Sequence, residues 1–325
     1  MSLPEHIARR LSIPAVCAPM FLISNPALLI AACRAGLVGA FPRENTRTRE
    51  DFVTWLQEIR TALDDAASEG ETLGPLAVNI PTRYPQEDLI VELDLCVEYG
   101  VEIIITSVGK PDLITRLAHE RGLYVWHDVT SIEFAEKALE CGVDGMNCIG
   151  AGGGGHSGTI SHLALIPRVR QMFDGVITMA GAVSTGAAIR AGEILGADLA
   201  FLGTRFLATT ESMAHPLQKQ WVVEGSARDL VYTPKVNGVP ANWMRRSLAH
   251  VGIDIDALPQ PEGRGHDHLP QGVRPWRDIW SAGHGIELID DVPDVATLVR
   301  RLAAEYLEAC ATPDRADAAR RLIRN

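Results

Sequence analysis

The sequence predicts a closed barrel of eight parallel β-strands separated by helices, a (β/α)8 barrel. Short runs rich in Val, Ile, Leu and Ala alternate with longer amphipathic stretches along the 325 residues, and eight such units follow in series before the pattern changes near residue 210. The short runs are apolar on both faces, as strands of parallel sheets are, and each parallel crossover needs a helix. Eight units in series favour closure into a barrel.

The predicted strands are residues 13–18, 37–41, 76–80, 101–106, 123–127, 145–149, 176–180 and 200–203. The predicted helices between and after them are residues 27–35, 49–68, 88–99, 111–121, 132–140, 163–169 and 185–195. In the helix over 49–68, Phe52, Leu56, Ile59 and Leu63 recur at the spacing of one helical face. Ser184 stands where the last of these helices needs an N-cap.

An open, doubly wound sheet is the alternative architecture. No G-x-G-x-x-G follows the first strand, where a dinucleotide-binding fold would carry it, and Pro19-Met20 stands there instead. Because a barrel takes about 250 residues, we expect a barrel core over 1–211 and an inserted lid or subdomain over 212–279. The insertion shows helical pieces over 217–223 and 243–248, and the chain then returns over 280–325, with a helix over 295–309.

Composition points to a globular protein with a small-molecule partner. Hydrophobic residues make up 46% and charged residues 22%, and the formal net charge of -11 opposes binding to nucleic acid or to an anionic membrane surface. The six cysteines show no C-x-x-C spacing, which indicates reduced thiols. Neither a signal peptide nor a membrane-spanning segment is evident, so we expect a cytoplasmic protein. A homo-oligomer is compatible with the sequence.

Four glycines, residues 152–155, lead directly into His156, and Gly158 follows after Ser157. Consecutive glycines are typical of backbone that adopts positive φ or approaches a ligand closely. An imidazole with a pKa near 6.5 suits proton transfer near neutrality. The segment follows the sixth predicted strand, so it lies at the end of the barrel where such folds place their chemistry.

Residues just past the carboxyl ends of the other strands face the same mouth. Small residues follow the seventh and eighth strands, at Gly181 and Gly203, where barrels repeatedly bind phosphate through backbone N–H groups. A phosphate-bearing cofactor is therefore expected. Asn79 and His127 lie across the mouth and suit a flat ring rich in heteroatoms, although each is also compatible with a structural role. The residues alone do not choose a flavin over a phosphosugar.

Several motifs together resemble the nitronate monooxygenases, formerly called 2-nitropropane dioxygenases. They occur in the family's order over nearly the whole chain: Ala18-Pro19-Met20, Val78-Asn79, Gly155-His156-Ser157-Gly158, Ala180-Gly181, Gly203-Thr204-Arg205-Phe206 and Ile279-Trp280-Ser281-Ala282-Gly283. The resemblance implies an FMN-dependent barrel with His156 as the base or anion-binding group. It also extends to flavin enoyl reductases and NAD(P)H:quinone reductases on the same fold.

The resemblance further implies individual roles. Ala18, Pro19 and Met20 would back the isoalloxazine ring, Asn79 would hydrogen-bond it, and His127 would lie near its edge or the ribityl chain. Gly181, Gly203 and Thr204 would hold the phosphate. Asn147, Gly155 and Ala180 complete the expected cofactor-binding set, and the expected substrate pocket comprises Phe21, Ser157, Trp280, Ser281 and His284.

The implied activity is oxidation of a nitronate, or of a nitroalkane, with O2 to a carbonyl compound and nitrite. The alternatives are a reductase that transfers hydride from NAD(P)H to a quinone or enoyl thioester, and, from another class, a flavin-free barrel that binds a phosphosugar. This chain departs from the family pattern at Phe21-Leu22, where many members have glycines, at Ala182, where a second glycine is common, and at His284, where we expect glutamine.

Two further segments attract attention. His266-Asp267-His268 resembles a metal-binding cluster, but no additional ligand spacing supports it, and we expect no metal site. The stretch 315–325, with four arginines, is expected to be an exposed helix end.

Overall fold

The computed structural model describes residues 2–312 and 316, and its centre is a closed barrel of eight parallel strands. Neighbours around the barrel follow the order β1-β2-β3-β4-β5-β6-β8-β9. The predicted barrel is thus confirmed, and the open sheet is excluded. The strands are β1 Ala15–Cys17, β2 Val38–Pro42, β3 Leu76–Asn79, β4 Ile103–Thr106, β5 Tyr124–Val129, β6 Gly145–Ile149, β8 Val176–Ala180 and β9 Leu199–Leu202.

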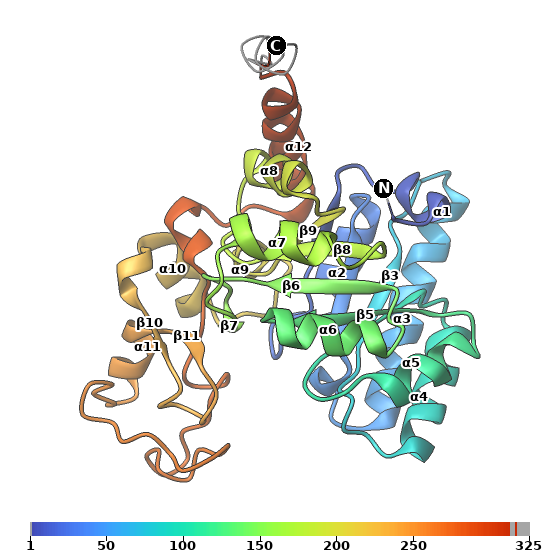
Figure 1. Ribbon diagram of the computed structural model, residues 1–325. Coiled ribbons are helices and arrows are strands. Elements are labelled where there is room, and N and C mark those ends of the chain that lie inside the picture. The colour runs from blue at the N-terminus through green and yellow to red at the C-terminus, as the bar shows by residue number, and fades with distance from the viewer. Residues whose placement is uncertain (1, 313–315, 317–325) are drawn as a thin grey trace, which may run out of the picture.

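Helices cover the outside of the barrel (Figure 1). They are α2 Pro26–Arg34, α3 Arg49–Ser68, α4 Gln86–Glu98, α5 Asp112–His119, α6 Ile132–Glu140, α7 His162–Arg170, α8 Gly186–Leu195 and the short α9 Thr204–Leu207. Side-chain caps fix several starts. One prediction was wrong here, because Thr185 and not Ser184 caps α8: the extended Thr185 accepts a hydrogen bond from the Ala188 N–H, whereas the Ser184 hydroxyl donates to the Gly285 carbonyl.

Alternation along the strands separates two apolar layers. Outward residues such as Val78 and Ile104 pack under the helices, and inward residues such as Ala77 and Trp126 fill the barrel. At the amino-terminal end of the chain, α1 (Glu5–Ala8) adds Ile7 to this inner layer. The inner layer leaves the carboxyl ends of the strands for the site.

The segment after α9 forms a separate cluster of elements beyond the carboxyl end of β6 (Figure 1). It contains α10 Pro216–Glu224, β10 Leu230–Thr233, β11 Ala241–Met244 and α11 Arg245–His250. The helix predicted over 243–248 was partly wrong, because Trp243 and Met244 lie in a strand; β11 pairs with β10 on one side and with β7 (Gly155–His156) on the other. That pairing buries Trp243 completely.

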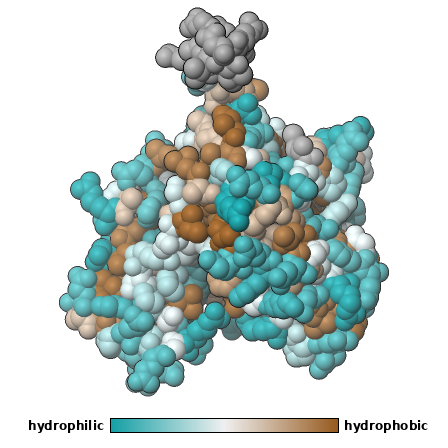
Figure 2. Space-filling view, viewed as in Figure 1, coloured by the Kyte–Doolittle hydropathy of each residue, from teal (hydrophilic) through white to brown (hydrophobic). Residues whose placement is uncertain are grey.

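The chain ends on α12 (Val295–Cys310), which packs along α8 and extends away from the barrel in Figure 1. Within the described part of the chain, short 3-10 helices lie at Arg43–Asn45, Ala227–Asp229 and His284–Leu288. The helix end expected over 315–325 lies, except for Ala316, outside the described residues. Figure 2 shows hydrophobic residues scattered among hydrophilic ones on the face that carries α6 and α7, where Phe134 and Leu163 are exposed.

Candidate active site

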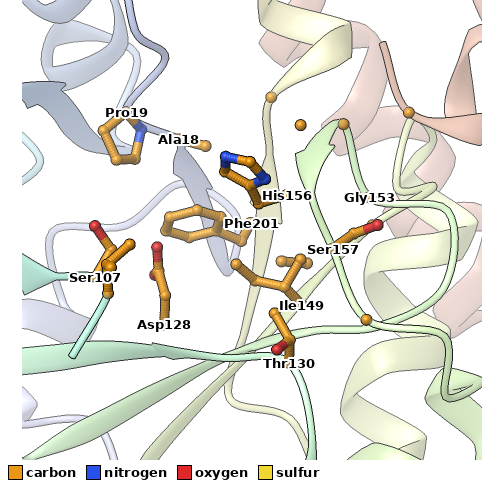
Figure 3. Close-up of a pocket in the computed structure, with 18 of the residues that line it drawn as sticks. Ala18, Pro19, Ser107, Asp128, Thr130, Ile149, Gly153, His156, Ser157 and Phe201 are labelled. Atoms are coloured by element: carbon orange, nitrogen blue, oxygen red, sulfur yellow. The ribbon is translucent and has the colours of Figure 1, made fainter. Parts of the chain in front are cut away.

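A cavity of about 1570 Å³ opens at the carboxyl ends of the strands. Drug-sized ligands occupy pockets of roughly 300–1,000 Å³, so this one has room for two partners at once. Most of the predicted site residues line it: Ala18, Pro19, Met20, Phe21, Asn79, His127, Gly155, His156, Ser157, Ala180, Gly181, Gly203, Thr204 and Ser281. Figure 3 shows the side chains of His156, Asp128, Ser107 and Phe201 around one common space.

Three predicted residues lie away from this lining. Asn147 is fully buried in the barrel interior, between Asp128 and Thr178. Trp280 stacks on His215, with 5.3 Å between ring centroids, and packs against Trp221. His284 lies behind the glycine loop, where its backbone N–H donates to the Gly152 carbonyl. The cavity wall near the last two is formed by Ser281, Ala282 and Gly283.

His156 is held by the inserted segment and not by the barrel. It forms β7 with Gly155, and β7 pairs antiparallel with β11, with His156 opposite Ala241. The imidazole Nδ1 lies 3.4 Å from the Pro240 carbonyl, which can only accept a hydrogen bond. Nδ1 therefore carries the hydrogen in this contact, and Nε2 remains a proton acceptor.

The surroundings of His156 favour its neutral form. Trp276 meets the imidazole edge-on, with 5.3 Å between ring centroids. The imidazole is exposed in the cavity, but the protein atoms packed around it reduce its hydration, and this partial desolvation lowers the pKa of His156. The Pro240 carbonyl raises that pKa and the nearby Arg264 lowers it, both less strongly. At neutral pH the imidazole is thus a base ready to accept a proton.

The glycine loop is tied to the inserted segment by two polar side chains. Asn242 on β11 donates to the Gly153 carbonyl at 2.7 Å, and the Tyr232 hydroxyl on β10 donates to the Ser157 carbonyl at 2.8 Å. Both residues lie in the insertion, which sequence reasoning treated as a lid without naming site residues. No spacing in the sequence signals them, because their role depends on a strand pairing between distant segments.

The loops after β6, β8 and β9 form a cradle of backbone. The N–H groups of Gly153, Gly154 and Ala182 donate to no acceptor within the described part of the chain. A Cβ on Gly154 would lie 3.0 Å from the Gly283 nitrogen, and one on Gly181 would lie 3.0 Å from the Gly153 nitrogen. Unpaired N–H groups on closely packed glycine backbone are what an anionic group such as phosphate requires. The donor set therefore fits the phosphate of a cofactor.

Two departures from the family pattern keep a glycine-like backbone. Ala182 has φ of 57° and Leu22 has φ of 59°, both in the left-handed region that glycine favours. Leu22 is held there by its N–H, which donates to the Asn45 side chain at 2.8 Å. The loop shapes expected of glycine are therefore retained, at a conformational cost.

Asn79 and His127 use one polar group each within the protein. The Asn79 amide donates to the Ile105 carbonyl at 3.2 Å, which leaves its side-chain oxygen as an acceptor in the cavity. The His127 Nδ1 lies 2.6 Å from the Thr106 hydroxyl, and burial lowers the pKa of His127 to about 4. His127 is consequently neutral at physiological pH and suits hydrogen bonding better than proton transfer.

Asp128 is a cavity residue that sequence reasoning missed. The predicted fifth strand ended at His127, but β5 continues through Val129. With Trp126 inside the barrel, strand alternation turns Asp128 inward as well, and its carboxyl faces the cavity. The signal in the sequence is the two-residue spacing between Trp126 and Asp128. If the strand is extended past His127, this spacing places both side chains on the inner face of the barrel.

Other features of the described residues concern metals and membranes. Over residues 2–312 and 316, no group of three His, Cys, Asp or Glu side chains is arranged to hold a metal ion. In the 266–268 cluster, His268 instead lies 2.7 Å from the Lys235 carbonyl. None of the described helices is long and apolar enough to cross a membrane.

Comparison with known proteins places this geometry in a family. The nitronate monooxygenase family model matches residues 53–305. A nitronate monooxygenase from Paraburkholderia phytofirmans is 27% identical over an alignment of length 280, and the alignment covers 74% of this chain and 76% of that protein. A crystal structure titled as nitroalkane oxidase from Streptomyces ansochromogenes shares the fold, with a TM-score of 0.74 at 24% identity, over 93% of this chain and 98% of that one.

A third relative is named for a different activity. It is the (3aS,4S,5R,7aS)-5-hydroxy-7a-methyl-1-oxo-octahydro-1H-indene-4-carboxyl-CoA dehydrogenase of Rhodococcus jostii, 26% identical over 238 residues that cover 73% of this chain. The match spans 64% of that dehydrogenase, less than two thirds of its length. With the family model matched over most of the sequence, the chain belongs to the nitronate monooxygenase family, a family of flavin-dependent oxidoreductases.

Proposed function

We propose that this protein is an FMN-dependent nitronate monooxygenase, which oxidises alkyl nitronates with O2 to a carbonyl compound and nitrite. One observation carries the proposal: a neutral imidazole, His156, and a cradle of unpaired N–H groups line the same cavity. The family match and the curated nitronate monooxygenases among the relatives support it.

In this proposal the cradle formed by Gly153, Gly154 and Ala182 binds the FMN phosphate. Ala18, Pro19 and Met20, at the end of β1, would contact the ring, and the free side-chain oxygen of Asn79 would be available to accept a hydrogen bond from it. When bound there, FMN would supply the redox chemistry that links nitronate oxidation to O2. The protein supplies binding, orientation and charge.

His156 performs the proton chemistry. Its Nε2 accepts the proton from the carbon next to a nitro group, which converts a nitroalkane into its nitronate. The imidazolium then formed holds the negative nitronate by charge and hydrogen bonding. Trp276 packs edge-on against the imidazole and lowers the local polarity, which strengthens this attraction relative to free solution.

The absorption spectrum of the purified protein is the first test. A bound flavin gives a visible band, and a colourless protein that takes up no FMN would contradict the proposal. Anaerobic addition of an alkyl nitronate should then bleach the band, whereas bleaching by NADH or NADPH alone would identify the reductase activity.

The role of His156 is tested by His156→Asn, which keeps the size and polarity of the side chain. The variant should retain its flavin and lose most kcat/KM with a neutral nitroalkane, by about 10²–10⁴-fold, the usual contribution of a general base. Turnover of a preformed nitronate should fall less, because its proton is already gone. Equal decreases in kcat/KM with the nitroalkane and with the nitronate would show that His156 binds the anion and does not act as a base.

A further inference from the structure

A polar chain of three side chains crosses the barrel interior beneath the cavity. Asp128 on β5, Asn147 on β6 and Thr178 on β8 are in register with one another. The Thr178 hydroxyl donates to the Asn147 side-chain oxygen at 2.8 Å, and the Asn147 amide donates to an Asp128 carboxylate oxygen at 2.9 Å. Asn147 and Thr178 are fully buried. Thr178 therefore orients the amide so that its NH2 group meets the carboxylate.

Among the described residues the Asp128 carboxyl forms no ion pair, and Asn147 is the side chain that hydrogen-bonds it. Inward neighbours such as Trp126, Ala180 and Phe201 are hydrophobic. The histidines that share its cavity are His127 on its own strand, which is bonded to Thr106, and His156 on β7, and the Tyr232 hydroxyl on β10 also lines it. Charged side chains of the cavity belong to rim residues: Glu44, Arg83, Lys110, Lys137, Glu140 and Arg264.

Asp128 is only partly exposed, and loss of hydration disfavours the ionised form of such a group. Desolvation raises the pKa of Asp128 to about 7, and the Asn147 hydrogen bond opposes the rise without cancelling it. Both the carboxylic acid and the carboxylate are then populated near neutrality. Figure 3 shows the carboxyl end of Asp128 directed into the space that His156 also borders.

We propose that Asp128 is a second proton-exchanging residue of this site, facing the bound flavin, and that the Asn147–Thr178 chain positions it. Asp128 takes up a proton from solvent, through the open cavity, when negative charge accumulates beside it, and releases the proton to solvent when that charge is removed. The inference rests on the proposed function for the presence of the flavin. The site would then contain two groups that exchange protons, the Asp128 carboxyl group and the His156 imidazole.

The proposal has a definite electrostatic consequence. A carboxylate near the flavin opposes the addition of electrons, whereas a neutral carboxylic acid does not. Replacement by the neutral isostere in Asp128→Asn should therefore raise the flavin reduction potential at pH 8.5 and leave it nearly unchanged at pH 5.5. The difference between variant and wild type should appear around the pH at which Asp128 ionises.

The experiment is a spectroelectrochemical titration of the flavin-loaded wild type and variant between pH 5.5 and 8.5. Glu44→Gln is the matched control, because Glu44 lines the same cavity but lies at its rim, paired with Arg83. This control should give a wild-type profile. Identical profiles for wild type and Asp128→Asn would overturn the proposal. In Asn147→Ala the carboxylate loses its amide donor, so the ionisation should move to higher pH.

A second readout needs no flavin. Because the folded-state pKa of Asp128 is raised above that of the unfolded chain, its contribution to stability is present at low pH and is lost as pH rises toward 7. The thermal midpoint of flavin-free Asp128→Asn, relative to wild type, should thus be higher at pH 8 than at pH 4. A constant difference would show that Asp128 does not titrate. A protein that binds no flavin but shows this pH dependence would refute the proposed function and not the titration of Asp128.

Discussion

Gly203→Val is the sharpest test of the phosphate cradle, because this glycine is not needed for the fold. Gly203 has φ of -102°, which any residue can adopt. A Cβ placed there would meet only Met20, at 3.8 Å from its sulfur, and would otherwise enter the cavity. Gly181→Val would be uninformative by comparison, since Gly181 has φ of 118° and packs on backbone.

The magnitude follows from the space that the side chain would occupy. Overpacking a filled site costs about 1–3 kcal/mol, and each 1.4 kcal/mol is a factor of ten in affinity. The dissociation constant of FMN should therefore rise by roughly 10- to 100-fold. The flavin-free protein should lose only about 1 kcal/mol or less, the cost of replacing a glycine at a helix N-cap.

The assay is titration of flavin-free protein with FMN, followed by flavin fluorescence, together with urea unfolding of the flavin-free protein. Gly263→Val is the matched control, because Gly263 has open space around it and is absent from the cavity wall. Unchanged FMN affinity in Gly203→Val, with the control also unchanged, would refute the placement of the phosphate beside Gly203.

Three further predictions concern charge and backbone strain. The kcat/KM for a neutral nitroalkane should fall only as pH drops below about 6.5, because the pKa of His156 is lowered. Trp276→Ala should move this fall to higher pH, because it exposes the imidazole to water. Ala182→Gly should raise the free energy of unfolding, measured in urea, by up to about 1 kcal/mol, since Ala182 is exposed and has φ of 57°. A lower free energy of unfolding in the variant would contradict the claim that the backbone at Ala182 is strained. Glu92→Gln should lower the free energy of unfolding by about 3 kcal/mol or more, because the buried Arg43 guanidinium would lose its carboxylate partner. A decrease of less than about 1 kcal/mol would show that this ion pair is not needed for stability.

Much of the site follows from strand order alone. Once eight parallel strands are recognised, Pro19, Asn79, His156 and Gly203 must meet at one rim, because each follows or ends a strand. The prediction failed where one strand was cut short: ending the fifth at His127 hid the inward Asp128 and left Asn147 without its partner.

The amino-acid sequence by itself determined the barrel, the glycine loop and the histidine, because apolar runs, helical spacing and glycines are local properties. Only the tertiary structure decided how His156 is held and how Asp128 is positioned and desolvated. The first depends on β11, some 85 residues downstream, pairing with β7, and the second on three strands meeting in register. Desolvation by distant segments, which sets both pKa values, has no signature in the order of residues.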